Sequence, residues 1–365
     1  MILSTRNLPD YLLSRGFVSH ESMVDGDLTI TDASHRNRAF RVLRGAHPSY
    51  FIKQIKEWDP ISVTCWDQEA AAYRRLASSS FVPAHYLSDI ESRILILDLV
   101  SGSESLSEYH RRTPSCPVSV GRKQGEVLSA LHLATQGSEE PGKIPWILSV
   151  HETNPAWFDS LSPANARLLE IVQEYPEYCE LLNSVRREWQ PSSLIHGDVK
   201  WDNLLISHSE SPNPQVILVD WEMAIFGDPC WDVGAVFQAY LNFWIYSMPF
   251  HEGIDADLLV SRAHRPLEQL QPAIRGFWES YSSAMGFDRA TSRARLTHSA
   301  RCGAARMIQS AYEMMHLWQQ MPPAGAAMLQ VSFNILNRPH DAVRDLLGIP
   351  LPGISDGISA GMSDD

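Results

Sequence analysis

The stretch SLIHGDVKWDNLLI, residues 193–206, places His, Asp, Lys and Asn between two apolar ends. The apolar ends predict a polar loop held between buried anchors. Within this loop, Asp198 stands five residues before Asn203. Seventeen residues beyond Asn203, the stretch ILVDWEMAIFGDPCWDVG, residues 217–234, places Asp220 at the end of an apolar strand. A loop and a strand end thus supply two carboxylates and one amide.

Phosphoryl transfer requires this set of groups. One carboxylate orients or deprotonates the acceptor hydroxyl, and oxygen ligands hold the Mg²⁺ that bridges the phosphates. Glu222, two residues after Asp220, is either a second metal contact or a hydrogen-bonding neighbour. Lys200 and Asp202 are expected to point away from the site as ordinary solvated charges.

The first hundred residues predict an antiparallel sheet with one inserted helix. The helix is expected at 61–77, where Trp66, Ala70 and Tyr73 recur at helical spacing. Glu69 falls beside this stripe, so its carboxylate is expected to face inward and to need a cationic partner. The last strand is nearly all apolar and is expected to be central. The strands are expected at 28–33, 39–44, 49–55, 84–90 and 93–100.

After a polar, hinge-like segment, the pattern becomes helical. Helix is expected within 120–135 and 163–189, and in almost everything from 231 onward. Two short strands, 203–206 and 216–221, are expected on either side of a loop rich in Ser, Pro and Asn. The small, polar C-terminal tail is expected to be disordered.

The motif HGD-x-x-x-x-N followed by D-x-E resembles that of the aminoglycoside phosphotransferase and choline kinase-like family, a branch of the protein-kinase-like fold. This resemblance implies an α+β, bilobal fold. A small five-stranded antiparallel lobe with one helix would precede a larger, mostly helical lobe. The parts are expected to be an N-terminal helical extension at 1–24, a nucleotide-binding lobe at 25–100, a helical lobe with the catalytic loop at 101–350, and a disordered tail at 351–365.

The resemblance also implies a role for each matching residue. Asp198 is expected to be catalytic together with His196, which packs under the site and orients the loop. Lys53, in YFIKQ, is expected to hold the α- and β-phosphates of ATP, with Glu69 as its helix partner. Each of these two charges would otherwise be buried and unpaired. Asn203, Asp220 and Glu222 are expected to be Mg²⁺ ligands. The backbone of residues Asp98 to Val100 is expected to contact adenine, and Asp232 is expected to brace the catalytic loop.

The link between the first two strands, DASHRNRAF, departs from the protein-kinase pattern because it contains no glycine. Protein kinases cover the phosphates with a glycine-rich loop at this place. Ser34 is expected to contact phosphate instead, with charge added by Arg36 or Arg38; the alternative is an ordinary polar turn. The missing glycines also leave open a degenerate nucleotide site.

Composition limits the class of partner. The 365-residue chain has a formal net charge of −13, so binding to a nucleic-acid backbone is not expected. Residues 101–240 hold 19 acidic and 9 basic residues. This excess of carboxylates either suits divalent cations or a cationic substrate, or forms a solvated acidic surface. Five scattered cysteines suit a reducing cytoplasm. No apolar run reaches the roughly 18–20 residues of a membrane span, and no secretory signal is expected.

These features predict an ATP- and Mg²⁺-dependent kinase whose acceptor is an alcohol group. The acceptor is expected to be an aminoglycoside-like molecule, an amino alcohol or a sugar, or a Ser or Thr of a biosynthetic peptide. A peptide acceptor is considered because the opening pattern also resembles phosphotransferase-like proteins near modified-peptide biosynthesis. Aromatic residues of the C-terminal helices form either core or a groove for a less polar acceptor. The alternative is a pseudokinase-like protein that binds a peptide or protein partner without transferring phosphate.

Overall fold

The computed structural model describes residues 1–45, 47–113, 115–137, 142–152, 161–207, 214–250 and 256–351. The chain divides into two compact units. The first unit comprises Met1–Pro114, Ala130–Gly142 and Ser192–Gly227; the second comprises Ser115–Ser129, Lys143–Pro191 and Asp228–Asp365. The first unit therefore contains both the early strands and the polar loop of the opening motif. Apart from residue 351, the predicted tail lies outside the described residues.

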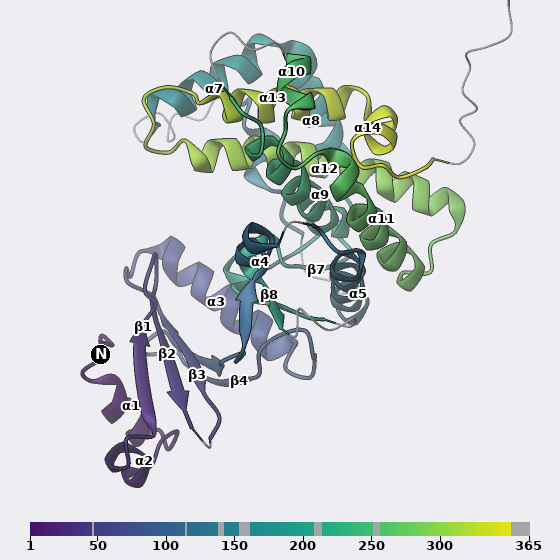
Figure 1. The fold of residues 1–365 in the computed structure, drawn as a ribbon. Helices are drawn as coiled ribbons and strands as arrows, with labels where there is room; N and C mark the ends of the chain where they lie inside the picture. Colours follow the sequence, from purple (N-terminus) through teal and green to yellow (C-terminus); the bar gives the residue numbers. More distant parts are fainter. Residues whose placement is uncertain are drawn as a thin grey trace, which may run out of the picture. The chain divides into compact units, whose positions relative to one another are not determined.

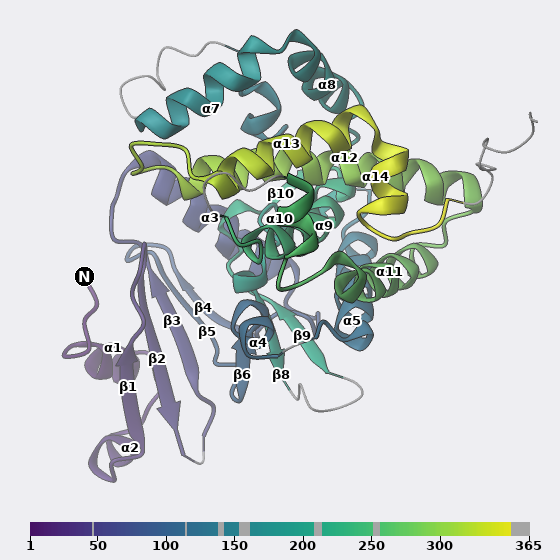
Figure 2. The ribbon, with the colours of Figure 1, turned by 45° about the horizontal axis from the view of Figure 1, so that its top comes forward.

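Five strands of the first unit form one antiparallel sheet in the order β1-β2-β3-β5-β4 (Figures 1 and 2). This confirms the predicted meander and its inserted helix. It also confirms the central place of β5, which pairs with β3 and β4 and buries four of its five residues. The strands are β1 (Leu28–Asp32), β2 (Arg38–Arg44), β3 (Tyr50–Gln54), β4 (His85–Asp89) and β5 (Ile94–Asp98).

Two short helices precede this sheet and cover part of it (Figure 1). They are α1 (Leu8–Ser14) and α2 (His20–Val24). Their apolar side chains share one core with strand residues of β2, β3 and β5. Burial of that apolar area, at about 25 cal/mol per Å², fixes the extension to the sheet. The shared core contains Leu3, Leu8, Tyr11, Leu12, Val18, Phe40, Val42, Tyr50, Ile52, Ile94 and Ile96.

Helix α3 (Pro60–Arg75) follows β3 and carries the predicted inward-facing carboxylate. Asp59 caps its start by accepting hydrogen bonds from the N–H groups of Ile61 and Ser62. Proline at the first helical position needs no N–H partner, which suits this start. Glu69 is only 2% exposed, as its place beside the apolar stripe predicts.

Two smaller sheets of the first unit carry the polar loop. β8 (Leu204–Ser207) pairs with β9 (Gln215–Leu218) and with β6 (Ser103–Ser105). β7 (Ser193–Ile195) pairs with β10 (Ile225–Gly227). The sequence predicted β8 and β9 but not the other three strands, because each of these is three residues long and shows no readable alternation.

The second unit is helical, and its described residues confirm the helix expected in almost everything from residue 231 onward (Figure 2). The pattern over 163–189 is interrupted at Tyr175, since Pro176 disfavours helical backbone in the residue before it. Among the described helices, none has the length and apolar character that a membrane span requires. The remaining helical elements are α4 (Leu106–Arg112, first unit), α5 (Val118–Ala134), η1 (Trp146–Ser149), α7 (Pro163–Glu174), α8 (Pro176–Arg187), α9 (Pro229–Tyr246), α10 (Ala256–Ser261), α11 (Leu267–Ala284), α12 (Arg289–Met314), α13 (Pro323–Asn337) and α14 (Pro339–Asp345).

The second unit depends on a close crossing of α9 and α12. A Cβ atom on Gly234 would lie 2.5 Å from the backbone N of Gly303 and 2.6 Å from the carbonyl O of Ser299. These are backbone atoms of the facing helix, so they have no side-chain freedom with which to move aside. The two glycines therefore set the distance between the helices.

Replacement of Gly234 by alanine should destabilise the protein by about 1–3 kcal/mol, because overpacking forces the two helices apart. Gly325→Ala is the matched control. Its Cβ would meet the flexible side chain of Met315 at 3.1 Å, and alanine favours helix. Urea unfolding of both variants checks this expectation; equal effects of the two substitutions would contradict it.

Candidate active site

The polar loop turns sharply at Gly197, between β7 and η2 (Trp201–Asn203). Gly197 has a φ of +79°, and a Cβ there would lie 2.3 Å from the carbonyl O of Met223. Both facts require glycine. The close approach places the turn beside the segment that follows Asp220.

His196 lies buried under this turn, with no exposed surface. Its Nε2 donates to the carbonyl O of Val219 at 2.9 Å, and its Nδ1 accepts from the N–H of Asp198 at 3.3 Å. The imidazole ring also packs on Trp221, with ring centroids 4.6 Å apart. His196 thus joins the backbone of Asp198 to the residue before Asp220, which makes it a positioning residue.

The Asp198 carboxylate is held by two neighbours in its own loop. Asn203 donates from Nδ2 to the carbonyl O of Asp198 at 3.0 Å and to its Oδ2 at 3.1 Å. Lys200 donates to the same Oδ2 at 2.7 Å. The prediction that Lys200 points away from the site is therefore wrong. A lysine two residues from a carboxylate turns toward it when the loop backbone curves, and residue spacing alone does not reveal that curvature.

Lys53 is the centre of a buried charge cluster. Its Nζ lies 2.7 Å from Oε2 of Glu69 and 3.8 Å from Oε2 of Glu222, and it donates to Oδ1 of Asp220. The Lys53 side chain is 11% exposed and that of Glu69 is 2% exposed. The strand lysine and the helix carboxylate thus meet, as each one's need for a buried partner predicts.

Opposing effects set the protonation of this cluster. Burial lowers the pKa of Lys53, but the carboxylates of Glu69, Asp220 and Glu222 outweigh it and raise the pKa well above its ordinary value. Burial raises the pKa of Asp220, and the Lys53 ammonium reverses the sign and lowers it. Burial raises the pKa of Glu69 to about 7, with Lys53 limiting the rise. Lys53 and Asp220 therefore form the charged core of the cluster.

Asp220 holds a strained backbone conformation at this point. Its φ and ψ are +66° and +65°, in the left-handed region that costs a non-glycine residue roughly 1–2 kcal/mol. Asp220 lies two residues beyond the end of β9 and caps the 3₁₀ turn η3 (Trp221–Met223), so the strand expected at 216–221 ends earlier than predicted. Such strain persists where surrounding contacts over-determine the backbone, and here it turns the carboxylate toward Lys53.

The glycine-free link between β1 and β2 is an ordered hairpin loop. Ser34 accepts a hydrogen bond from the N–H of Ala39 at 3.0 Å, so its hydroxyl serves the loop itself. Arg36 and Asn37 contact Glu222. Together with Lys53 and Glu69, these three residues line a small cavity. Contact of Ser34 with phosphate stays a prediction, and so does contact of Arg38 with phosphate.

The expected adenine-contacting segment begins at Asp98, the last residue of β5. Asp98 donates its N–H to Ala84, Leu99 donates its N–H to Ser49, and the carbonyl O of Val100 accepts from Ser103. These bonds fix the segment but do not test its role, so the adenine contacts of Asp98 and Val100 stay predictions. Asp232 is fully buried on α9, and its brace for the catalytic loop likewise stays a prediction.

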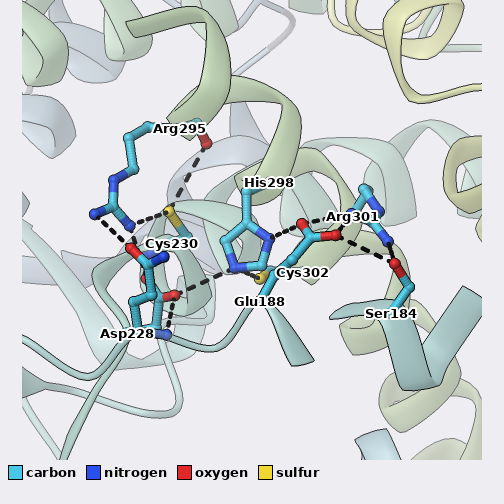
Figure 3. A network of polar contacts seen from close by, with 9 residues as sticks. Ser184, Glu188, Asp228, Cys230, Arg295, His298, Arg301 and Cys302 are labelled. Carbon is cyan, nitrogen blue, oxygen red and sulfur yellow. Dashed lines mark hydrogen bonds and ion pairs between the residues drawn. The ribbon is translucent and has the colours of Figure 1, made fainter. Parts of the chain in front are cut away.

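The second unit holds another buried polar network, which the sequence did not reveal (Figure 3). Asp228 caps α9 and accepts from the N–H groups of Cys230 and Gln190, both at 2.9 Å. The His298 imidazole lies between two carboxylates, 3.2 Å from Asp228 and 3.4 Å from Glu188. Asp before Pro signals a helix cap, but nothing in the spacing indicates a histidine 70 residues away.

Ligand atoms of Asp228, Cys230 and His298 lie within 4.8 Å of one another, as in a metal site. However, both carboxylate oxygens of Asp228 already accept backbone N–H bonds, and one of them also contacts the imidazole. A metal ion would have to displace these donors. The network is therefore best explained as an ion-paired brace for the start of α9.

Comparisons with known proteins agree with this geometry. Residues 30–277, more than half of the chain, match the family model described as "Phosphotransferase enzyme family". No curated protein matches. A choline kinase from Cryptosporidium parvum Iowa II is 10% identical, with a TM-score of 0.54 over 94% of this chain and 97% of that one. Amicoumacin kinase hAmiN is 12% identical, with a TM-score of 0.50 over 89% and 95%. These likenesses confirm the predicted protein-kinase-like fold.

His298→Gln should cost about 1–3 kcal/mol of stability at pH 7, because the buried Asp228 loses the imidazole contact at 3.2 Å and keeps only the longer Arg295 contact at 3.7 Å. Burial raises the pKa of Asp228, but the hydrogen bond and charge of His298 lower it below its ordinary value of 3.8. A lowered pKa stabilises the fold above about pH 4, and this contribution is lost as the pH falls further. The difference between wild type and variant should therefore shrink below pH 4.

Urea unfolding at pH 7 and at pH 3.5 measures this difference. His340→Gln, an exposed histidine of the same unit, is the control and should have no effect at either pH. A stability loss of equal size at both pH values would contradict the assigned role of His298.

Proposed function

Because the chain belongs to the phosphotransferase enzyme family, we propose that it transfers the γ-phosphoryl group of ATP to a hydroxyl group of a small molecule, with Mg²⁺ as the metal. The observation that carries this proposal is the buried Lys53 cluster. It gathers a strand lysine, its helix carboxylate and the strand-end Asp220 around one ammonium group. The loop bearing Asp198 is tied to the same strand end through His196.

The residues present suit a hard divalent cation. Asp220, Glu222 and Asn203 offer carboxylate and amide oxygens, the ligands that Mg²⁺ prefers. Asn203 and Asp220 are placed close by the backbone, since the N–H of Val219 donates to the carbonyl O of Asn203 at 3.0 Å. When bound there, Mg²⁺ would neutralise phosphate charge and hold the β- and γ-phosphates in place.

The protein groups act mainly by position and charge. Asp198 aligns the acceptor hydroxyl and accepts its proton. Lys200 and Asn203 fix the direction of the Asp198 carboxylate. Lys53, held by Glu69, binds the phosphates that precede the transferred group.

A small-molecule acceptor is the part of the proposal supported by the neighbours. The two similar solved structures are those of a choline kinase and an amicoumacin kinase. Neither supports a Ser or Thr of a biosynthetic peptide as acceptor. The pseudokinase alternative is not favoured either, because a pure binding protein has no need for Lys53, Asp198 and Asp220 in this arrangement.

Asp198→Asn should reduce turnover by roughly two orders of magnitude or more, because the amide no longer accepts the hydroxyl proton. Binding of the Mg²⁺–nucleotide complex should remain. Asp202→Asn is the matched control, since this carboxylate lies in the same loop but is exposed. ATP consumption with a panel of small alcohols measures turnover. Unchanged turnover in Asp198→Asn would contradict the role given to Asp198.

Asp220→Asn should abolish the dependence of nucleotide binding on Mg²⁺, with affinity for the complex falling at least ~10-fold. Calorimetric titration with ATP, with and without Mg²⁺, measures this effect, and Asp202→Asn again serves as control. If Asp220→Asn binds Mg²⁺–ATP as wild type does, the metal site lies elsewhere. If wild type binds ATP under neither condition, the proposed function fails.

A further inference from the structure

We propose that Arg36 is a positioning residue. It holds the Glu222 carboxylate in the absence of nucleotide and releases it to the metal when the nucleotide phosphates bind. This inference rests on the proposed function and concerns the same site. It gives the glycine-free loop between β1 and β2 a function in metal and nucleotide binding. Glu222 would contact Arg36 first and the metal ion afterwards.

The loop is stiffened by its own side chains. Asp32 accepts from the N–H of Ser34 at 2.8 Å, and Ser34 accepts from the N–H of Ala39 at 3.0 Å. The N–H of Ala33 donates to the carbonyl O of Ala39 at 2.8 Å, and Lys56 contacts the carbonyl O of His35. These bonds close the base of the loop and present Arg36 and Asn37 at its tip.

The tip contacts both oxygens of Glu222. Nη1 of Arg36 lies 3.4 Å from Oε1, and Nδ2 of Asn37 lies 3.4 Å from Oε2. The Arg36 side chain is 69% exposed, whereas that of Glu222 is 16% exposed. Both contacts are long, and that of Arg36 is also solvent-exposed, so the ion pair between Arg36 and Glu222 is weak and exchanges readily. The same Glu222 oxygen that accepts from Asn37 lies 3.8 Å from Lys53.

Charge explains why Glu222 needs a partner from the loop. Three carboxylates, those of Glu69, Asp220 and Glu222, surround the single ammonium of Lys53. Glu69 and Asp220 lie closer to the ammonium than Glu222 does. Glu222 is thus the least neutralised of the three, and Arg36 supplies the missing positive charge.

A metal ion that binds Glu222 must compete with Arg36 and Asn37 for the same two oxygens. Phosphate oxygens brought in with that metal would offer Arg36, whose side chain is 69% exposed, a new anion beside Glu222. Arginine suits this exchange because its guanidinium remains charged and binds carboxylate and phosphate with similar geometry. An arginine side chain would thus contact the phosphates where protein kinases use the backbone of a glycine-rich loop.

The test separates binding of metal from binding of nucleotide. Mg²⁺ alone, and then AMP-PNP in saturating Mg²⁺, are titrated calorimetrically into wild type and Arg36→Ala. The variant should bind Mg²⁺ alone about two- to fivefold more tightly, because the competing contact is gone. It should bind AMP-PNP with Mg²⁺ roughly tenfold more weakly, because a charge-assisted bond to phosphate is lost.

Two further variants show whether Arg36 acts through Glu222. Arg41→Ala removes an exposed arginine from the same β2 strand and should leave both affinities unchanged. In a Glu222→Gln background, Arg36→Ala should no longer tighten Mg²⁺ binding. The inference would be overturned if Arg36→Ala changed the affinities for Mg²⁺ and for AMP-PNP in the same direction. It would also be overturned if Arg36→Ala still tightened Mg²⁺ binding in the Glu222→Gln background. Either result would leave the proposed function intact. Absence of Mg²⁺-dependent AMP-PNP binding in wild type would overturn both.

Discussion

The buried ammonium of Lys53 is the constraint on which the first unit depends. A buried charge without partners is strongly unfavourable, so the fold must bring carboxylates to it. Glu69 comes from α3, which fixes the helix against β3. Asp220 comes from the strand end, and its left-handed backbone is retained because the Lys53 contact and the 3₁₀ turn require it. One ammonium thus determines where three separate segments meet.

Much of this arrangement could be predicted from the sequence, because it follows local patterns. The helical stripe around Glu69 and the apolar strand bearing Lys53 each predicted a buried charge, and the two charges proved to be partners. Contacts set by loop backbone curvature escaped prediction, as Lys200 shows. So did His298, whose partner Asp228 is 70 residues away and is joined to it only by tertiary packing. Sequence periodicity carries no information about such distant pairs.

The two buried polar networks differ in charge balance. Around Lys53, the three acidic side chains of Glu69, Asp220 and Glu222 are met by two cations, Lys53 and Arg36. Around Asp228, the carboxylates of Asp228 and Glu188 are met by Arg295, Arg301 and His298. The second network is neutralised by its own side chains and needs no further cation. The first retains negative charge, which makes it the better place for a divalent ion.

The same reasoning applies to the glycine-free loop between β1 and β2, for which we propose contact with phosphate. A glycine-rich loop brings backbone N–H groups close to phosphate, at the cost of greater chain entropy in the unfolded state. Here Asp32 and Ser34 order the loop through side-chain bonds, and an arginine at its tip supplies positive charge. A stiff loop needs a movable contact to admit a ligand, and an exposed arginine on a long side chain provides one. Under the proposed function, the weakness of the contact between Arg36 and Glu222 would therefore allow this loop to admit a metal ion and a nucleotide.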